Sequence, residues 1–229
     1  MSAKSPVRPT ASAEQRKLIG ALFDHAGPTY ARAAGIRLRD TPAPLWQLLV
    51  LANLLSARIS ADIAVAAARE LFAAGGTTAK GMAGLTWRQR VDALGRGHYV
   101  RYDESTASRL GDCADLAQHE YSGDLRRLAG RAGHDPEKIG ERLRAFKGIG
   151  PSGVTIFFRE AQAVWPFLRP RFDKIALDGA RRLGLPASAA DLCALVRGDD
   201  LAKFSAALVR VSRDRELAGT VASAAGSGR

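Results

Sequence analysis

The chain is poor in the residues that hold metal clusters and disulfide frameworks. Only two cysteines, Cys113 and Cys193, occur among its 229 residues. Two thiols are too few for a four-thiolate iron–sulfur cluster, and their spacing does not match a Cys-x-x-Cys zinc site. The four histidines show no metal-ligand spacing either. We therefore expect reduced structural cysteines, no metal and no cofactor.

Long hydrophobic runs and strand patterns are also missing. The most apolar stretch, residues 45–57, has only Gln47, Asn53 and Ser56 as polar positions, and it is too short to span a bilayer. No segment shows the period-two alternation of a strand. Both ends of the chain are rich in small and polar residues and have no hydrophobic signal-peptide core. The sequence therefore predicts an all-α protein of the cytoplasm, without a membrane partner.

Helical periodicity is the signal that the chain does carry. Its hydrophobic content of 46% is enough for one substantial core or two small lobes. Apolar residues recur at helical spacing in five segments besides the hairpin described below, which are residues 45–57, 60–73, 87–94, 105–116 and 201–211. Residues 45–57 should be buried on nearly every side. In residues 201–211 the predicted inward stripe is Leu201, Phe204, Leu208 and Val211.

The charge of the chain favours a polyanionic partner. The formal net charge is +11, with 34 Lys and Arg against 23 Asp and Glu. Residues 126–182 contain 13 Lys or Arg and 6 Asp or Glu, so this quarter of the chain holds +7 of the +11. A clustered basic excess is typical of nucleic-acid binding, although a solvated charged face is the alternative.

The segment from Leu143 to Phe158, LRAFKGIGPSGVTIFF, predicts two helices joined by a glycine turn. Upstream, Asp135 can cap a helix that has Pro136 at its first position. Gly148 and Gly150 then permit backbone φ values that are closed to other residues, and Pro151 or Ser152 opens the second helix. The predicted inward stripes are Ile139, Leu143 and Phe146 in the first helix and Val154, Phe157, Phe158 and Ala161 in the second.

The turn of this hairpin is a candidate phosphate site. Amides around Lys147, Gly148, Ile149 and Gly150, with the positive end of the second helix, would present donors to an anion without reading a base sequence. An ordinary helix–helix turn is the alternative, because a G-x-G turn is weak evidence by itself.

Four motifs in order resemble those of the helix-hairpin-helix DNA glycosylase superfamily, nearest to endonuclease III. They are LLSARISAD at residues 54–62, GHY at residues 97–99, KGIG at residues 147–150, and Asp173 followed by RLGL at residues 182–185. The resemblance spans residues 44–185. It implies an all-α fold of two helical lobes with a DNA-binding cleft between them, and double-stranded DNA with a damaged or mismatched base as partner.

The resemblance also implies a domain organisation. We expect a six-helix lobe over residues 44–163 that contains the helix-hairpin-helix at residues 136–163. Residues 13–43 and 164–217 should form the second lobe. Residues 1–12 and 218–229 should be flexible tails.

Asp173 is the implied catalytic carboxylate. In the resembling enzymes this aspartate stabilises positive charge on the deoxyribose, or orients the nucleophile, while the glycosidic bond breaks. Capping the following helix is an alternative role for it. Asp178 competes for the assignment, because the interval from the hairpin to Asp173 is longer than in endonuclease III. Ala52 stands where adenine-specific relatives have a glutamate, which implies a different base class.

Ser152 departs from the pattern of bifunctional members, which have a nucleophilic lysine at this position. A serine cannot form a Schiff base, so the sequence predicts a monofunctional glycosylase. Lys174 and Lys147 are nearby amines that would have to replace the missing lysine in a bifunctional enzyme; phosphate contact or solvent exposure is the other interpretation of both. A DNA-structure-binding protein without catalysis is a further alternative.

Three residues are candidates for contact with bases. Arg58 stands where relatives carry a glutamine that fills the gap left by an extruded base, and its alternative is an ion pair with Asp62. Tyr99 and Tyr102, in a glycine-flanked basic turn, are candidates for the base pocket. The tryptophans Trp46, Trp87 and Trp165 are expected in the core.

Overall fold

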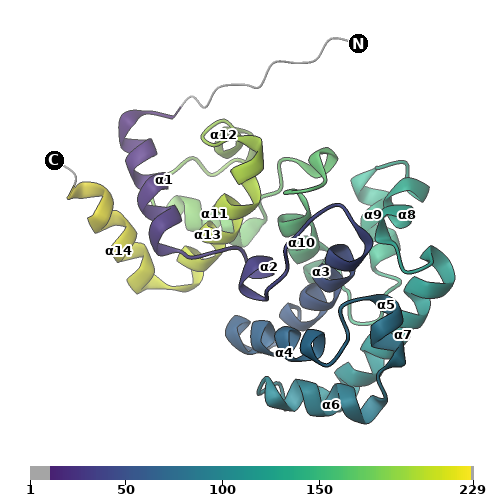
Figure 1. Cartoon of the computed structure of the whole chain (residues 1–229). Coiled ribbons are helices and arrows are strands. Elements are labelled where there is room, and N and C mark those ends of the chain that lie inside the picture. Colours follow the sequence, from purple (N-terminus) through teal and green to yellow (C-terminus); the bar gives the residue numbers. More distant parts are fainter. Residues whose placement is uncertain (1–10, 228–229) are drawn as a thin grey trace. The chain divides into compact units, whose positions relative to one another are not determined.

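The computed structural model describes residues 11–227, and every regular element in this range is a helix. The all-α prediction is therefore confirmed (Figure 1). The chain divides into two compact units. The central unit comprises residues 30–167, and the terminal unit combines the segment up to residue 29 with residues 168 onward.

The central unit contains the helices α2 to α10. Their bounds are α2 Tyr30–Ala33, α3 Pro42–Leu55, α4 Ala61–Ala73, α5 Ala79–Gly84, α6 Trp87–Arg96, α7 Asp103–Tyr121, α8 Leu125–Arg131, α9 Pro136–Leu143 and α10 Pro151–Ala161. A short 3₁₀ turn, η1 (Pro166–Leu168), follows α10. All the helices predicted in this part of the chain are present, and α7 extends beyond both predicted ends.

Helix α3 is the core of the central unit, as its composition predicts. Proline at the first position of the helix suits its beginning, because an N–H there would have no intrahelical acceptor. Nine of its residues, including Trp46 and Asn53, are buried, and the helix contacts α4, α8 and α10. Asn53 is the one polar side chain among the buried residues of this helix.

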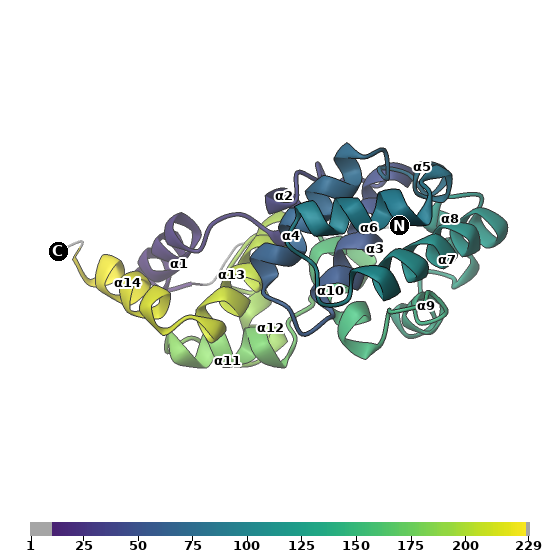
Figure 2. The ribbon, with the colours of Figure 1, turned by 90° about the horizontal axis from the view of Figure 1, so that it is seen from below.

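Helix α6 packs against both α4 and α7 in the central unit (Figure 2). Ser60 and Thr86 cap α4 and α6 with their hydroxyls. A Cβ on Gly97 would lie 2.4 Å from the Cα of Ala67, so only glycine permits this approach of α6 to α4. The buried guanidinium of Arg90 donates to the carbonyls of Ala107, Met82 and Leu85 and so ties α6 to α5 and α7.

The terminal unit contains α1 (Ala13–His25), α11 (Lys174–Arg182), α12 (Ala189–Cys193), the 3₁₀ turn η2 (Gly198–Asp200), α13 (Leu201–Arg213) and α14 (Arg215–Gly226). The predicted stripe of α13 is confirmed, because Leu201, Phe204, Leu208 and Val211 are all buried. Phe204 makes edge-to-face contacts with Phe23 and Phe172. A Cβ on Gly179 would lie 2.0 Å from the carbonyl oxygen of Leu208, so this glycine lets α11 lie directly on α13.

The prediction of a flexible tail over residues 218–229 is wrong in its described part. Asp214 caps α14, which runs to Gly226 and buries Ala218 and Val221 against α1 and α13. Figure 1 shows α14 beside α1. At the other end, residues 1–10 of the predicted tail lie outside the described residues, while Ser12 is the cap of α1. Residues 30–43 and 164–167, predicted with the terminal segments, cluster with the central unit.

Candidate nucleic-acid interface at the hairpin

The two helices of the hairpin begin and pack where the sequence predicts. The carboxylate of Asp135 accepts hydrogen bonds from the amides of Glu137 and Lys138, which starts α9. The inward residues Ile139, Leu143 and Phe146 are fully buried. A Cβ on Gly140 would lie 3.3 Å from Cγ1 of Val154, so α9 and α10 approach closely at this glycine. In α10, Phe157, Phe158 and Ala161 are buried, whereas Val154 is half-buried.

Only one of the two turn glycines has a conformation that requires glycine. Gly148 has a φ of +87°, in the left-handed region. Gly150 has a φ of −89° and a ψ of −168°, which any residue can adopt. The predicted special conformation is therefore confirmed at Gly148 and wrong at Gly150. Between them, the side chain of Ile149 points into the core and is 3% exposed.

The turn presents a set of backbone donors. Within the described residues, the amides of Gly148, Gly150 and Ser152 donate to no acceptor, while the amide of Ile149 bonds to the carbonyl of Phe146. Gly148 and Ser152 are exposed and Gly150 is half-buried. The last two of these amides lie at the positive end of α10. Amides in this arrangement suit an anion that approaches the turn from solvent.

Two other helices fix the turn in place. The side chain of Asn53, from α3, donates from Nδ2 to the carbonyl oxygen of Lys147 at 2.8 Å. The thiol of Cys113, from α7, donates to the same carbonyl at 3.2 Å. Asn53 also lies against Gly148, because a Cβ on that glycine would be 2.7 Å from Nδ2 of Asn53. The turn is thus held by side-chain bonds that are remote in sequence.

Ser56, at the C-terminal cap of α3, lies against the second hairpin helix. A Cβ on Gly153 would lie 2.9 Å from Oγ of Ser56. Two of the three polar positions in the apolar stretch 45–57, Asn53 and Ser56, therefore face the hairpin. The sequence analysis did not assign this role to either residue. The signal was Asn53, because a side-chain amide buried inside an apolar helix needs a polar partner.

Lys147 forms an ion pair that the sequence did not predict. Its ammonium lies 2.7 Å from Oδ2 of Asp112 on α7, and both side chains are largely exposed. The hydrogen bond from Lys147 to Asp112 raises the pKa of the lysine. The ammonium is therefore protonated at neutral pH and already has an anionic partner.

The thiol of Cys113, next to Asp112 in the sequence, is expected to be unreactive. Burial raises the pKa of Cys113 to about 12, and the nearby carboxylate of Asp112 acts in the same direction. Thiol reactivity depends on the thiolate, so Cys113 should be inert in the folded protein. Its sulfur acts here as a donor that holds the hairpin carbonyl.

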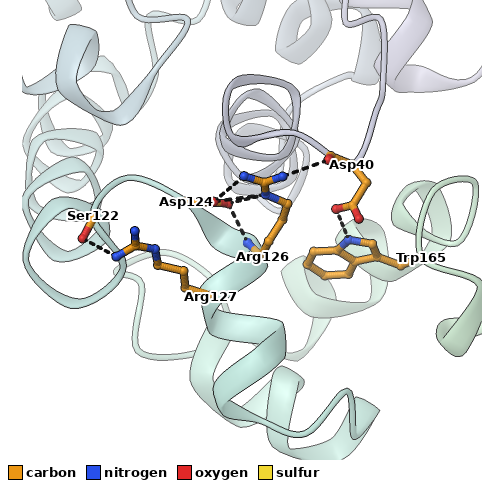
Figure 3. A network of polar contacts seen from close by, with 6 residues as sticks. All are labelled: Asp40, Ser122, Asp124, Arg126, Arg127 and Trp165. Carbon is orange, nitrogen blue, oxygen red and sulfur yellow. Dashed lines mark hydrogen bonds and ion pairs between the residues drawn. The ribbon is translucent and has the colours of Figure 1, made fainter.

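Some of the basic residues counted in the sequence serve the fold. Figure 3 shows the guanidinium of Arg126 in a fork with the carboxylate of Asp124, with a longer bond to the carbonyl of Asp40. The carboxylate of Asp40 accepts from Nε1 of Trp165 at 2.8 Å. The bond with Arg126 lowers the pKa of Asp124. This network joins the start of α8 to the loop before α3.

Other basic side chains face solvent near the hairpin. Lys138, Arg142 and Arg144, on and just after α9, are exposed. Within the described residues they form no ion pair. These three side chains are therefore exposed cations of the first hairpin helix and the residue after it that have no acidic partner in the described part of the chain.

Asp173 and Lys174 lie in the terminal unit, at the start of α11. The carboxylate of Asp173 is half-buried and accepts from the amide of Ala176 at 2.9 Å, so it caps the helix. Lys174 is exposed at the first helical position. The competitor Asp178 lies in the same helix and pairs with Arg181. The capping role that sequence reasoning weighed for Asp173 is therefore present.

The candidate base-contacting residues lie in two loops of the central unit. Arg58 is exposed between α3 and α4, and no ion pair joins it to Asp62 within the described chain. Tyr99 is 1% exposed, so it belongs to the core, and this burial raises its pKa. Tyr102 is half-buried, with the guanidinium of Arg101 5.3 Å from its ring centroid.

The tryptophan prediction holds for two of three residues. Trp46 and Trp165 are buried, but Trp87 at the start of α6 is 41% exposed. Its indole N–H donates to the carbonyl of Glu104 and the hydroxyl of Ser108 on α7, which explains an exposed position without a base-stacking role. In the described residues, no group of three His, Cys, Asp or Glu side chains is placed to hold a metal ion. None of the described helices is long and apolar enough to cross a membrane.

Comparison with known proteins gives a single structural likeness to report. No protein-family model matches the chain, and no curated protein matches it in sequence. A solved structure, a trapped endonuclease III–DNA covalent intermediate in an estranged-adenine complex, aligns with a TM-score of 0.44 and 13% identity. The alignment covers 87% of this chain and 85% of that chain.

Proposed function

We propose that this protein binds double-stranded DNA through the hairpin between α9 and α10. The observation that carries the proposal is the turn with three amide donors that bond to no protein acceptor in the described chain, those of Gly148, Gly150 and Ser152. Phosphate is the anion that DNA presents in regular repeats, and backbone amides bind it without reading sequence. Exposed Lys138, Arg142 and Arg144 add attraction for the same strand.

We further propose that the bound DNA is a substrate. The order of the four glycosylase-like motifs supports a repair enzyme that flips a damaged or mispaired base and hydrolyses its N-glycosidic bond. Asp173 is the proposed catalytic carboxylate. A carboxylate there would stabilise the oxocarbenium-like sugar as the bond breaks, and would orient the water that attacks it. Arg58 is the proposed residue for the gap in the duplex, and Tyr102 remains a candidate for the pocket.

Water is the proposed nucleophile because neither Ser152 nor Lys147 offers an amine suited to attack the sugar. Ser152 has no amine. Lys147 is a poor candidate, since its pair with Asp112 raises its pKa and a nucleophilic lysine needs a lowered one. Lys174 remains the candidate for a bifunctional glycosylase and lyase. Incubation with damaged DNA and borohydride should trap no covalent complex, whereas a complex lost on replacing Lys174 would establish the bifunctional enzyme.

A non-catalytic DNA-binding protein is the second candidate. The observation that favours it is the cap on α11, because the bond from the amide of Ala176 gives Asp173 a structural role. In that case the hairpin would recognise distorted DNA and no base would be released.

One experiment separates these functions. Duplexes carrying uracil, oxidised pyrimidines, alkylated purines or mismatches are incubated with the protein, and strand breaks are compared with and without alkali. Breaks that need alkali support a monofunctional glycosylase, and breaks without alkali support a lyase. Binding without any release of base, over the whole panel, supports the binding protein.

The Asp173→Asn variant makes the test of the carboxylate sharp. Asparagine caps helices about as well as aspartate, so α11 should keep its cap while the charge is lost. We expect base release to fall by at least about 100-fold, a typical loss for a group that stabilises transition-state charge, with unchanged DNA affinity. Asp173→Ala, which also removes the cap, is the control for stability. Unchanged turnover in the asparagine variant would exclude Asp173 as the catalytic group and direct attention to Asp178.

A further inference from the structure

The ion pair between Lys147 and Asp112 places an acidic side chain at a site proposed to bind an anion. Lys147 belongs to the turn whose amides face solvent, and its ammonium pairs with Asp112 on α7, outside the hairpin. The neighbouring residue of α7, Cys113, bonds to the main-chain carbonyl of Lys147. Both ends of this lysine are therefore held by consecutive residues of one helix.

The carboxylate and a phosphate would compete for the same ammonium. At 2.7 Å the pair is a charge-assisted hydrogen bond. A phosphate bound at the turn would either draw the ammonium away from Asp112 or bind without it. In either case Asp112 reduces the attraction between the positive charge of Lys147 and a phosphate at the turn.

We propose that Asp112 limits the affinity of the hairpin for the DNA backbone by holding the ammonium of Lys147. The inference rests on the proposed function, because it concerns the phosphate site assigned there. In free protein Asp112 neutralises Lys147, and binding then depends mainly on the backbone amides and on the exposed side chains of α9. A protein that must move along undamaged DNA gains from this restraint, since tight binding to every phosphate would hold it in place.

The test is a double-mutant cycle on affinity for a fluorescein-labelled, undamaged DNA duplex, followed by anisotropy. Asp112→Asn keeps the size of the side chain and frees Lys147. We expect it to bind roughly two- to fivefold more tightly, the range that corresponds to an exposed ion pair. The slope of log K against log salt should steepen by about 0.9, because one more phosphate is neutralised.

Two further variants isolate the cause. Asp115→Asn makes the same change of charge one turn along α7, at an exposed residue without an ion pair in the described chain, and should leave affinity nearly unchanged. In the Lys147→Gln background, Asp112→Asn should give no gain. Circular dichroism of each variant checks that the helices are intact.

The results distinguish the two proposals. If wild-type protein binds no duplex, the proposed function fails and the restraint fails with it. If wild-type protein binds but Asp112→Asn is no tighter than wild type, only the restraint is overturned. An equal gain from Asp115→Asn, or a gain that persists without Lys147, would also overturn it, because long-range repulsion would then explain the effect.

Discussion

Replacing Gly148 by alanine should destabilise the central unit, while the same change at Gly150 should not. Gly148 has a φ of +87°, and alanine in the left-handed region costs about 1–2 kcal/mol. The new Cβ would also lie 2.7 Å from Nδ2 of Asn53. This amide is buried and hydrogen-bonded to the carbonyl of Lys147, so its displacement costs roughly a further 1 kcal/mol or more. We expect the free energy of unfolding to fall by about 2–4 kcal/mol in total.

Gly150 is a matched control two residues away. Its φ of −89° suits alanine, and no atom lies within 4 Å of the position of a new Cβ. Alanine there also reduces the conformational entropy of the unfolded chain. We therefore expect Gly150→Ala to be neutral or to stabilise the protein by up to about 1 kcal/mol.

Tryptophan fluorescence during urea unfolding is the suitable assay. All three tryptophans, Trp46, Trp87 and Trp165, belong to the central unit, so their signal follows the unit that contains the hairpin. Equal stability of wild type and Gly148→Ala would refute the contribution of strain and of the Asn53 contact. Equal destabilisation by both alanines would show that Gly150 also has a conformation that requires glycine.

Three further predictions concern other parts of the molecule. Arg126 lowers the pKa of Asp124, so this pair stabilises the fold above about pH 4, the pKa of the unfolded state. The contribution is lost as the pH falls through the lower pKa of the folded state. The stability advantage of wild type over Asp124→Asn should therefore shrink in acid, and a constant difference would contradict the pairing. Maleimide at neutral pH should label half-buried Cys193 well before Cys113, whose pKa is raised to about 12, as mass spectrometry of labelled peptides would show. Removing residues 215–229 should lower the stability of the terminal unit and expose apolar surface of α1 and α13 to a hydrophobic dye, whereas an unchanged unfolding curve would restore the flexible-tail prediction.

The hairpin was predictable because its signals are local. The cap at Asp135, the proline after it and the spacing of buried residues all lie within a few positions of each other. The bonds that fix the turn are different, since Asn53 is 94 residues from its partner Lys147, and Asp112 is 35 residues from it. No local pattern pairs such residues, so sequence reasoning found the turn and missed its support.

The errors also have local causes. Composition suggested a tail after residue 217, but alanine favours helices, and the cap at Asp214 with Val221 on the buried face makes α14 stable. The glycine-flanked basic turn made Tyr99 a candidate for the base pocket, and nothing in the local pattern indicated how deeply this side chain is buried. Gly97 instead brings α6 against α4, and Tyr99 enters the core directly after it.

The pairing of basic residues changes how the charge of the chain should be understood. The basic excess over residues 126–182 includes Arg126, Lys147 and Arg181, each of which has an acidic partner. The partners of Arg126 and Arg181 are two and three residues away in the sequence. Counting charges therefore overestimates the number of side chains that can neutralise DNA phosphates and release their counterions. Within the described residues, acidic side chains do not pair with the amide donors of the turn. Because these amides carry no net charge, we expect their bonds to phosphate to depend less on salt than ion pairs do. DNA affinity that persists at high salt should accordingly come from the turn at Gly148 and Gly150, and the part that salt removes should come from α9.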